Sequence, residues 1–255
     1  MSKKRLEAKL QEIFQRKNEE WKRYARELMA QDSKVFSPRR MSRLLQKQHE
    51  RILQLAQEKG IPPENIVYYI PQKKSSYGLI KMMYASTNKI PSNQIVTSVE
   101  GIRAVKGKKL IVVLDDITSS GTQPLTTYKI VREKSRLSSD VAFCPLIASA
   151  KAVRRFKKLG AKDPLLYFLP CLKVKGFKRG SYIKSLTEQE RKRFYQLMQD
   201  DGFILNGHGG NALNVVFPYM APNSNNVFWN DIIASLFLRS PNGVRQNAQW
   251  QLVDF

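Results

Sequence analysis

Between residues 64 and 169, short apolar runs alternate with stretches that have the spacing of amphipathic helices. The apolar runs have the length of strands and lie at Ile66–Ile70, Leu110–Leu114, Val141–Ala148 and Leu165–Leu169. The helical stretches between them lie at Leu79–Ala85, Gln123–Arg136 and Lys151–Leu159. This alternation is typical of a mainly parallel sheet with helices on both faces. The sequence therefore predicts an α/β fold with a mainly parallel sheet and flanking helices.

The first 59 residues have a different pattern. Apolar residues recur every three or four positions over residues 3–30, which predicts one long helix with Lys, Arg and Glu on its other faces. Ser37-Pro38 provides an N-cap and first-turn residue for a second helix, and Gly60 ends it. Further along, we expect a helix at 187–198, a strand at 213–217 and a short helix at 228–237. The predicted division is a basic helical extension (1–59), an α/β core (60–200) and a small C-terminal segment (201–255).

The charge of the chain is strongly positive. It has 44 Lys and Arg against 21 Asp and Glu, a formal net charge of +23. Most of the excess lies in residues 1–59, with a net charge of +8, and in residues 151–200, with a net charge of +10. Such an excess favours a polyanionic partner, most often nucleic acid, here RNA or single-stranded DNA.

Other features narrow the class of protein. No apolar run approaches the roughly 20 residues needed to cross a bilayer, and the basic start leads into no apolar signal segment. Cys144 and Cys171 lie in apolar stretches, where buried inert thiols are expected. His49 and His208 lack the neighbours of a zinc site. We therefore expect a cytoplasmic protein without a membrane segment.

The segment Leu110–Thr122 carries the clearest chemistry. A buried apolar strand delivers Asp115 and Asp116 to its C-terminal end, which is where ligands bind in open α/β sheets. A loop of hydroxyl residues and a glycine follows and leads into a helix, so backbone N–H groups, hydroxyls and the helix dipole can all hold a phosphate. Two carboxylates beside a bound phosphate would repel it. Ribose hydroxyls and Mg²⁺ would relieve this repulsion, because both bind carboxylate oxygens.

Four apolar residues, two acids and a Thr/Ser-rich loop that ends on Gly-Thr resemble the motif with which type I phosphoribosyltransferases bind 5-phosphoribosyl diphosphate (PRPP). The resemblance implies that the catalytic Asp115 and Asp116 hold the ribose hydroxyls, directly or through Mg²⁺. It implies that the 5′-phosphate is held by Thr118, Ser119, Ser120, Gly121 and Thr122. An ordinary α/β loop with an Asp N-cap and a receiver-type acidic pocket are the alternatives to a PRPP site.

Type I sites also have a diphosphate loop after an earlier strand. The matching segment follows Ile66–Ile70 and contains Lys73, Lys74, Ser75 and Ser76, which would supply charge and N–H donors. The alternative is a solvated turn. The stretch 87–109 lies where this family has a mobile loop that closes over the substrate.

The C-terminal segment is rich in aromatic and Asn residues. It resembles the Pro-Asn-Asn and Trp tail of phosphoribosyltransferase-like proteins from bacterial conflict and antiviral operons, some of them encoded beside retron reverse transcriptases. The resemblance implies a hood that selects the acceptor through Tyr219, Asn223, Asn225, Asn226 and Trp229. A turn with Asn caps before a helix is the alternative.

Residues 173–184 combine basic and aromatic side chains with glycines. An arm of this kind can contact nucleic-acid phosphates and stack on exposed bases, and a solvated charged loop is the alternative. The residues expected to contact nucleic acid are Lys173, Lys175, Phe177, Lys178, Arg179 and Tyr182.

Three hypotheses from different classes follow. The first is a PRPP- and Mg²⁺-dependent phosphoribosyltransferase that acts in bacterial antiviral defence, with a protein partner such as a reverse transcriptase. The second is a catalytically inactive PRPP-sensing or nucleic-acid-binding module of a nucleoprotein complex. The third is a structural subunit that its basic helices dock on a nucleoprotein, and the sequence leaves open whether the chain forms an oligomer.

Overall fold

A computed structural model describes residues 19–32, 34–36, 38–70, 77–104, 109–134, 139–174, 181–200 and 215–216. The chain divides into two compact units. One consists of Met1–Pro38 together with Lys175–Phe255, and the other of Arg39–Val174. We call the second the α/β unit because it contains the main sheet, and the first the terminal unit.

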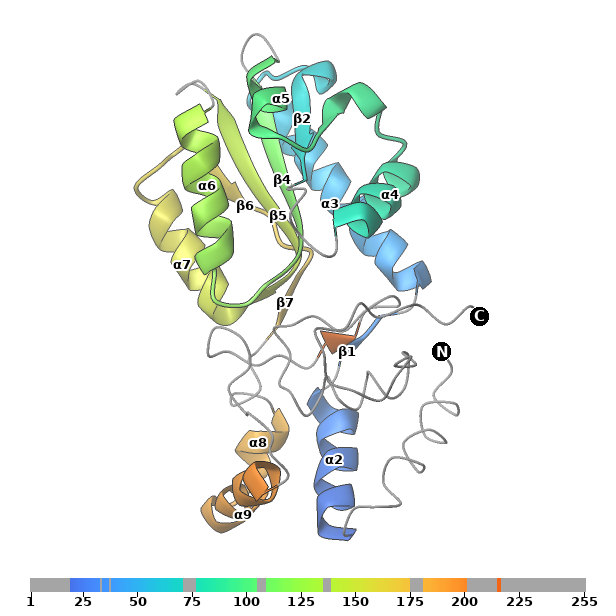
Figure 1. Cartoon of the computed structure of the whole chain (residues 1–255), viewed down its shortest axis with the longest axis vertical. Coiled ribbons are helices and arrows are strands. Elements are labelled where there is room, and N and C mark those ends of the chain that lie inside the picture. The colour runs from blue at the N-terminus through green and yellow to red at the C-terminus, as the bar shows by residue number, and fades with distance from the viewer. Residues whose placement is uncertain are drawn as a thin grey trace. The chain divides into compact units, whose positions relative to one another are not determined.

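The sheet of the α/β unit has six strands, and every pairing in it is parallel (Figure 1). The strands are β2 (Ile66–Tyr69), β3 (Ile95–Val96), β4 (Leu110–Thr118), β5 (Asp140–Ser149), β6 (Leu166–Phe168) and β7 (Leu172–Val174). Their order is β3-β2-β4-β5-β6, and β7 pairs with the last three residues of β5. The predicted mainly parallel α/β sheet is confirmed.

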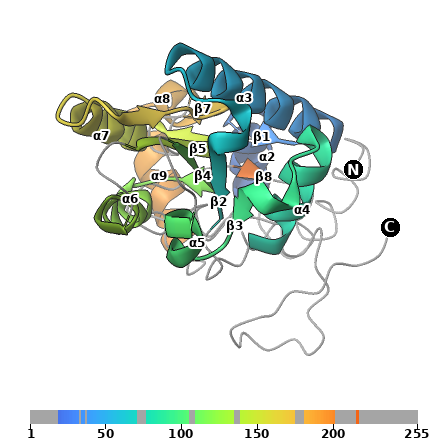
Figure 2. The same ribbon diagram turned by 90° about the horizontal axis from the view of Figure 1, so that it is seen from above.

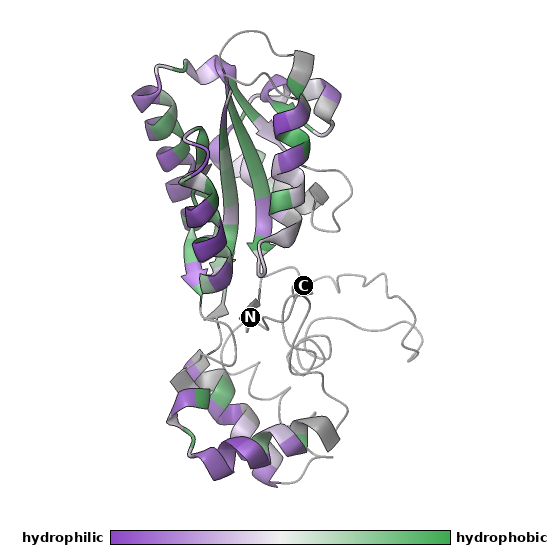
Figure 3. Ribbon diagram, turned by 90° about the vertical axis from the view of Figure 1, so that its left-hand side faces the viewer, coloured by the Kyte–Doolittle hydropathy of each residue, from purple (hydrophilic) through white to green (hydrophobic). Residues whose placement is uncertain are grey.

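The central strands are hydrophobic along almost their whole length (Figure 3). Every residue of β5 is buried, and in β4 Ile117 alone is half-buried. Parallel strands that are covered on both faces have such near-continuous apolar runs. Their burial is therefore the structural reason for the apolar runs that predicted them.

Helices cover both faces of this sheet. They are α3 (Pro38–Glu58), α4 (Tyr77–Asn88), α5 (Val99–Ala104), α6 (Thr122–Lys134) and α7 (Ala150–Gly160), with short 3₁₀ turns at Pro63–Asn65 and Ser92–Gln94. Seen from above, α5, α6 and α7 lie on one side of the sheet and α3 and α4 on the other (Figure 2). The predicted helices on both faces are thus confirmed.

The first face forms a continuous apolar core. Ile102 of α5, Val131 of α6 and Phe156 of α7 belong to one cluster with the strand residues Ile111 and Val113. The cluster is completed by Tyr69, Tyr128, Val141, Phe143 and Leu166. Since the contributing strand positions are two residues apart, they point to the same face of the sheet.

The second face is packed by α3. His49 of this helix lies beside two tyrosines, with its Nδ1 atom 3.2 Å from the Tyr68 hydroxyl and 3.5 Å from the Tyr84 hydroxyl. Gln48 is buried and donates to the carbonyls of Pro145 (3.1 Å) and Leu169 (3.0 Å). These contacts make α3 part of the α/β unit, whereas the predicted boundary placed it in a separate extension.

The two cysteines lie on this same face. Cys144 is fully buried in β5, and burial raises the pKa of its thiol well above the ordinary value. Burial also raises the pKa of the half-buried Cys171 to about 12. Thiols with raised pKa values are protonated at neutral pH and therefore unreactive. The prediction of a buried inert thiol is confirmed for Cys144.

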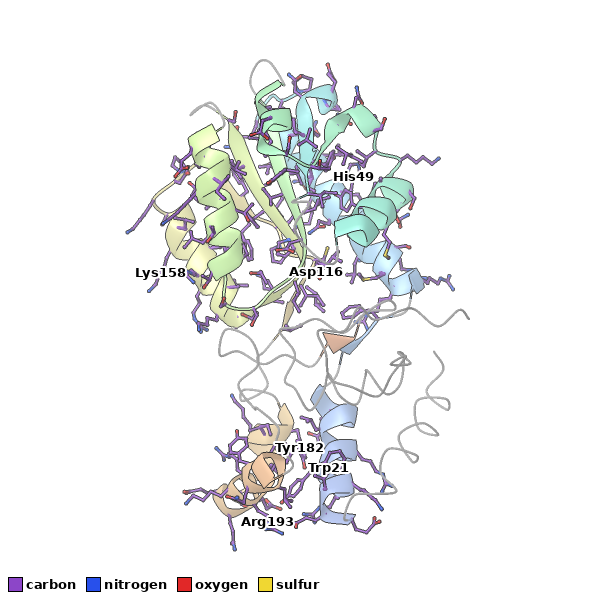
Figure 4. All side chains as sticks on the ribbon, viewed as in Figure 1. Trp21, His49, Asp116, Lys158, Tyr182 and Arg193 are labelled. Atoms are coloured by element: carbon purple, nitrogen blue, oxygen red, sulfur yellow. The ribbon has the colours of Figure 1, made fainter. Side chains whose placement is uncertain are left out.

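The terminal unit combines segments from both ends of the chain. Its described elements are α2 (Glu19–Asp32), β1 (Lys34–Val35), α8 (Ser181–Ser185), α9 (Glu188–Asp200) and β8 (Val215–Val216). The strands β1 and β8 pair in parallel. Trp21 and Tyr182 lie between α2 and α8, and Arg193 of α9 forms an ion pair with Glu20 of α2 at 3.0 Å (Figure 4). None of the helices in the described ranges is long and apolar enough to cross a membrane.

The predicted and observed elements differ most where they are short. The described part of the predicted N-terminal helix begins at Glu19, and residues 1–18 lie outside the description. The elements β1, β3, α5, β7 and α8 were not predicted, because strands and helices of two to six residues carry little periodicity. β3 and α5 lie within the stretch that we expected to be a mobile loop. The predicted helix at 228–237 also lies outside the described residues.

Candidate active site

The strand β4 positions the two acids. The acids were expected to follow the strand, but β4 continues through both of them to Thr118. Asp115 is 2% exposed and Asp116 8% exposed, so both are anchored in the sheet, and Asp116 lies near the C-terminal end of β4 (Figure 4). Each carboxylate accepts a hydrogen bond from the next backbone N–H, from Asp116 to Asp115 Oδ1 at 3.0 Å and from Ile117 to Asp116 Oδ1 at 2.8 Å. These bonds orient the carboxylates before any ligand binds.

The loop after β4 leads directly into α6. Ser120 Oγ donates to the Thr122 hydroxyl (3.1 Å) and accepts from the Thr122 N–H (3.2 Å). Gly121 has a φ of +75°, a conformation that favours glycine. The loop therefore turns tightly onto the N-terminus of α6, where the helix dipole is positive and backbone N–H groups suit an anion.

A buried hydroxyl in this segment has no partner among the described residues. Thr118 is 1% exposed, and its Oγ1 forms no hydrogen bond in the part of the chain that the structure describes. An unsatisfied buried polar atom costs about 1–3 kcal/mol. A ligand oxygen in the loop would give this hydroxyl a partner, and the orphaned atom thus fits a site built for a polar ligand.

The loop is braced by the next strand and helix, a feature that the sequence did not reveal. The Ser149 hydroxyl at the end of β5 donates to the Ser119 carbonyl and accepts from the Ala152 N–H at 3.1 Å, so that it also caps α7. Arg155 of α7 donates from Nη1 to Thr122 Oγ1 at 2.9 Å and to the Ser120 carbonyl at 3.4 Å. Ser before an amphipathic helix is a recognisable cap signal, but its bond to the loop depends on the tertiary fold.

The donor set at this edge suits a ribose phosphate with Mg²⁺. No group of three or more His, Cys, Asp or Glu residues in the described ranges could hold a metal by itself. Mg²⁺ is commonly held by one or two carboxylates together with water and the phosphates of a substrate. Asp115 and Asp116 match that pattern, so the residues fit a metal that arrives with the ligand.

Several predicted site residues lie outside the described part of the chain. The diphosphate loop with Lys73, Lys74, Ser75 and Ser76 lies outside the described residues. The hood residues Tyr219, Asn223, Asn225, Asn226 and Trp229 also lie outside them, as do Lys175, Phe177, Lys178 and Arg179 of the predicted arm. Their roles stay predictions.

The two described ends of the predicted arm belong to a strand and a helix and not to a loose loop. Lys173 is exposed and belongs to β7. Tyr182 belongs to α8 and is 1% exposed, with its ring centroid 6.3 Å from that of Phe194. The prediction that Tyr182 stacks on exposed bases is wrong, because its ring is packed into the core of the terminal unit.

Comparison with known proteins identifies the family. A family model described as PRTase-CE matches residues 7–234. A comparison with curated proteins found no match.

Solved structures similar to the chain include two phosphoribosyltransferases. One is the HGPRT-ase from Leishmania tarentolae in complex with GMP, with 13% identity over 56% of this chain and 81% of that chain and a TM-score of 0.37. The second is a hypoxanthine-guanine phosphoribosyltransferase from Bacillus anthracis, with 17% identity over 48% of this chain and 76% of that chain and a TM-score of 0.32. A hypothetical protein from Neisseria gonorrhoeae with bound ppGpp shows 12% identity over 67% of this chain and 98% of that chain, with a TM-score of 0.40.

The family match spans most of the sequence, including β4 with its acid pair and the hydroxyl loop. The chain therefore belongs to the PRTase-CE family.

Proposed function

We propose that the chain binds PRPP with Mg²⁺ at the C-terminal edge of β4 and transfers or releases its phosphoribosyl group. The observation that carries this proposal is the juxtaposition of a buried acid pair with a glycine-containing hydroxyl loop at a helix N-terminus. In this arrangement Asp115 and Asp116 hold the ribose hydroxyls, and the loop Thr118–Thr122 holds the 5′-phosphate. One end of the ligand thus needs carboxylates and the other needs N–H and hydroxyl donors.

The proposed reaction is a displacement at the anomeric carbon of the ribose. The bond between this carbon and the diphosphate oxygen breaks, diphosphate leaves with the electron pair, and an acceptor nucleophile forms the new bond and loses its proton. The pre-oriented carboxylates fix the sugar, which lowers the entropic part of the barrier. Mg²⁺, when bound there, would stabilise the negative charge of the departing diphosphate.

We further propose that this activity serves a bacterial antiviral defence system, in a complex that includes a protein such as a retron reverse transcriptase. The support is the resemblance of the Pro222–Trp229 tail to proteins of such systems. The acceptor would be a base, a nucleotide or a macromolecule, and the proposed location is the cytoplasm.

A direct test measures PRPP binding by calorimetry and diphosphate release by an enzymatic assay, each with and without Mg²⁺. We expect PRPP to bind at least about tenfold more weakly in EDTA, because Mg²⁺ held with the help of Asp115 and Asp116 would offset the negative charge of the ligand. Diphosphate release with a suitable acceptor would demonstrate transfer. Mg²⁺-dependent binding without release would support the PRPP-sensing alternative, and no PRPP binding in either buffer would refute the proposed function.

The exposed face of α7 favours nucleic-acid binding as a second candidate function. The helix has five exposed cations and no acid: Lys151, Arg154, Arg155, Lys157 and Lys158. Lys151, Arg154, Lys157 and Lys158 recur at three- and four-residue spacing. They therefore form one stripe on the side of the helix opposite the buried Ala152 and Phe156. None of the five forms an ion pair within the described ranges, whereas Lys192 of α9 pairs with Glu188 at 2.9 Å. Unneutralised stripes of this kind fit a phosphate backbone.

The triple variant Arg154→Gln, Lys157→Gln and Lys158→Gln tests this surface. If α7 contacts phosphates, its affinity for single-stranded DNA or RNA should fall, and the log–log dependence on salt should flatten by up to about two units. Fluorescence anisotropy at several salt concentrations measures both. A control that removes three exposed lysines elsewhere, Lys47, Lys89 and Lys129, should change the slope less. Equal effects of the two variants would mean that the charge acts nonspecifically.

A further inference from the structure

Arg155 of α7 places a positive charge beside the loop Thr118–Thr122, which contains no basic residue. The segment Thr118–Thr122 contains hydroxyl residues and a glycine, and the two acids precede it. A phosphate there would meet N–H and hydroxyl donors but no positive side chain from the loop. Arg155 comes from α7, and its Nη1 lies 2.9 Å from the Thr122 hydroxyl.

Some N–H donors of the Arg155 guanidinium form no hydrogen bond within the described residues. Nη1 makes both hydrogen bonds to the loop, to Thr122 Oγ1 and to the Ser120 carbonyl. Nε and Nη2 form no hydrogen bond in the described part of the chain, and the side chain is exposed. Three N–H donors thus remain in the planar fork that matches a phosphate bidentately.

The stem of Arg155 is also positioned by the fold. A Cβ atom at Gly121 would come within 3.2 Å of Arg155 Cδ and 3.5 Å of the Ala152 Cα. The stem therefore lies against the glycine at the tightest point of the loop. Ser149, which caps α7 and bonds the Ser119 carbonyl, ties the start of this helix to the same loop.

From this geometry we propose that Arg155 contacts the 5′-phosphate of the ligand. The inference rests on the proposed function, since it assigns a further residue to the same phosphate loop. Any oxygen bound to the Thr122 hydroxyl lies within a few ångströms of the guanidinium. A charge-assisted hydrogen bond is stronger than a neutral one, and the cation also offsets the repulsion between the acids and the phosphate.

The test compares PRPP and ribose 5-phosphate as ligands, because they share the sugar and the 5′-phosphate. Calorimetry is done on wild type, Arg155→Met and Arg155→Lys. Arg155→Met keeps an apolar stem on Gly121 and removes the charge, so we expect both ligands to bind roughly 10- to 100-fold more weakly. Arg155→Lys keeps the charge without the fork and should recover part of the loss. Lys129→Met, which removes an exposed cation from α6, should bind both ligands like wild type.

Each other result has a definite meaning. Wild-type affinity of Arg155→Met for both ligands would overturn the role of Arg155 while leaving the PRPP site standing. If Arg155→Met and Arg155→Lys weaken ligand binding equally and both lower the melting temperature, Arg155 only supports the loop. This result would also overturn the proposed contact with the phosphate. A wild-type protein that binds neither ligand would refute the PRPP site and the role of Arg155 together.

Discussion

Replacing Asp115 and Asp116 together by Asn is expected to abolish Mg²⁺-dependent PRPP binding, with a loss of at least about a hundredfold in affinity. A hydrogen bond to a charged group is worth about 1.5–3 kcal/mol, and two such groups are lost together. The substitutions preserve the size of both side chains, so the melting temperature should stay within about 5 °C of wild type. Calorimetry with PRPP and thermal melts measure the two quantities.

The direction of the change in PRPP affinity distinguishes direct binding of the ligand by the two acids from a general electrostatic effect. If the acids did not contact the ligand, their removal would reduce repulsion of the polyanionic PRPP and tighten its binding. A control with Glu100→Gln and Glu133→Gln removes two exposed carboxylates from α5 and α6 and should bind PRPP at least as well as wild type. Undiminished binding in the Asp variant would contradict the assignment of the acid pair.

The sheet could be predicted because its signal is local. The apolar runs of β4 and β5 are buried on both faces, and the acids interrupt β4 where the chain approaches the sheet edge. The strand nevertheless extends to Thr118, since backbone pairing with β5 continues through Ile117 and Thr118 whatever their polarity. The sequence therefore indicated the correct strand and acids but placed the end of the strand too early.

The packing of α3 could not be predicted from its sequence. The apolar stripe of α3 must pack against another element, but its sequence does not identify that element. The predicted boundary therefore joined the helix to the basic N-terminal segment. The structure instead brings His49 beside Tyr68 and Tyr84, residues that are 19 and 35 positions away in the chain. Contacts at such separations follow from the tertiary fold and have no periodic signature.

The same limit explains why Ser149 and Arg155 were missed in the candidate site. The motif Asp115–Thr122 is contiguous, and its residue types alone indicate a phosphate and a sugar. Ser149 and Arg155 reach the loop from the next strand and helix, 30 or more positions later. In the sequence Arg155 is one of several basic residues in α7, and nothing distinguishes it until α7 is packed beside the loop.

Gly121→Val should cause the second large loss, in both PRPP affinity and stability. At a φ of +75° a β-branched residue is strained by about 1–3 kcal/mol. Its Cβ would also lie 3.2 Å from Arg155 Cδ, so the loop or the arginine must move. We expect at least about a thirtyfold loss of PRPP affinity and a melting temperature lower by several degrees. Ser119→Ala, which removes one hydroxyl, should cost less than about tenfold.

Gly121→Asn separates backbone strain from crowding, because Asn tolerates positive φ better than other residues with a side chain. We expect this variant to melt close to wild type and still to bind PRPP more weakly, since its Cβ crowds Arg155 in the same way as that of valine. Calorimetry and thermal melts on the three variants provide the comparison. If Gly121→Val and Ser119→Ala prove equally mild, the phosphate does not lie in this loop, whereas wild-type affinity in Gly121→Asn would mean that strain alone accounts for the effect of valine.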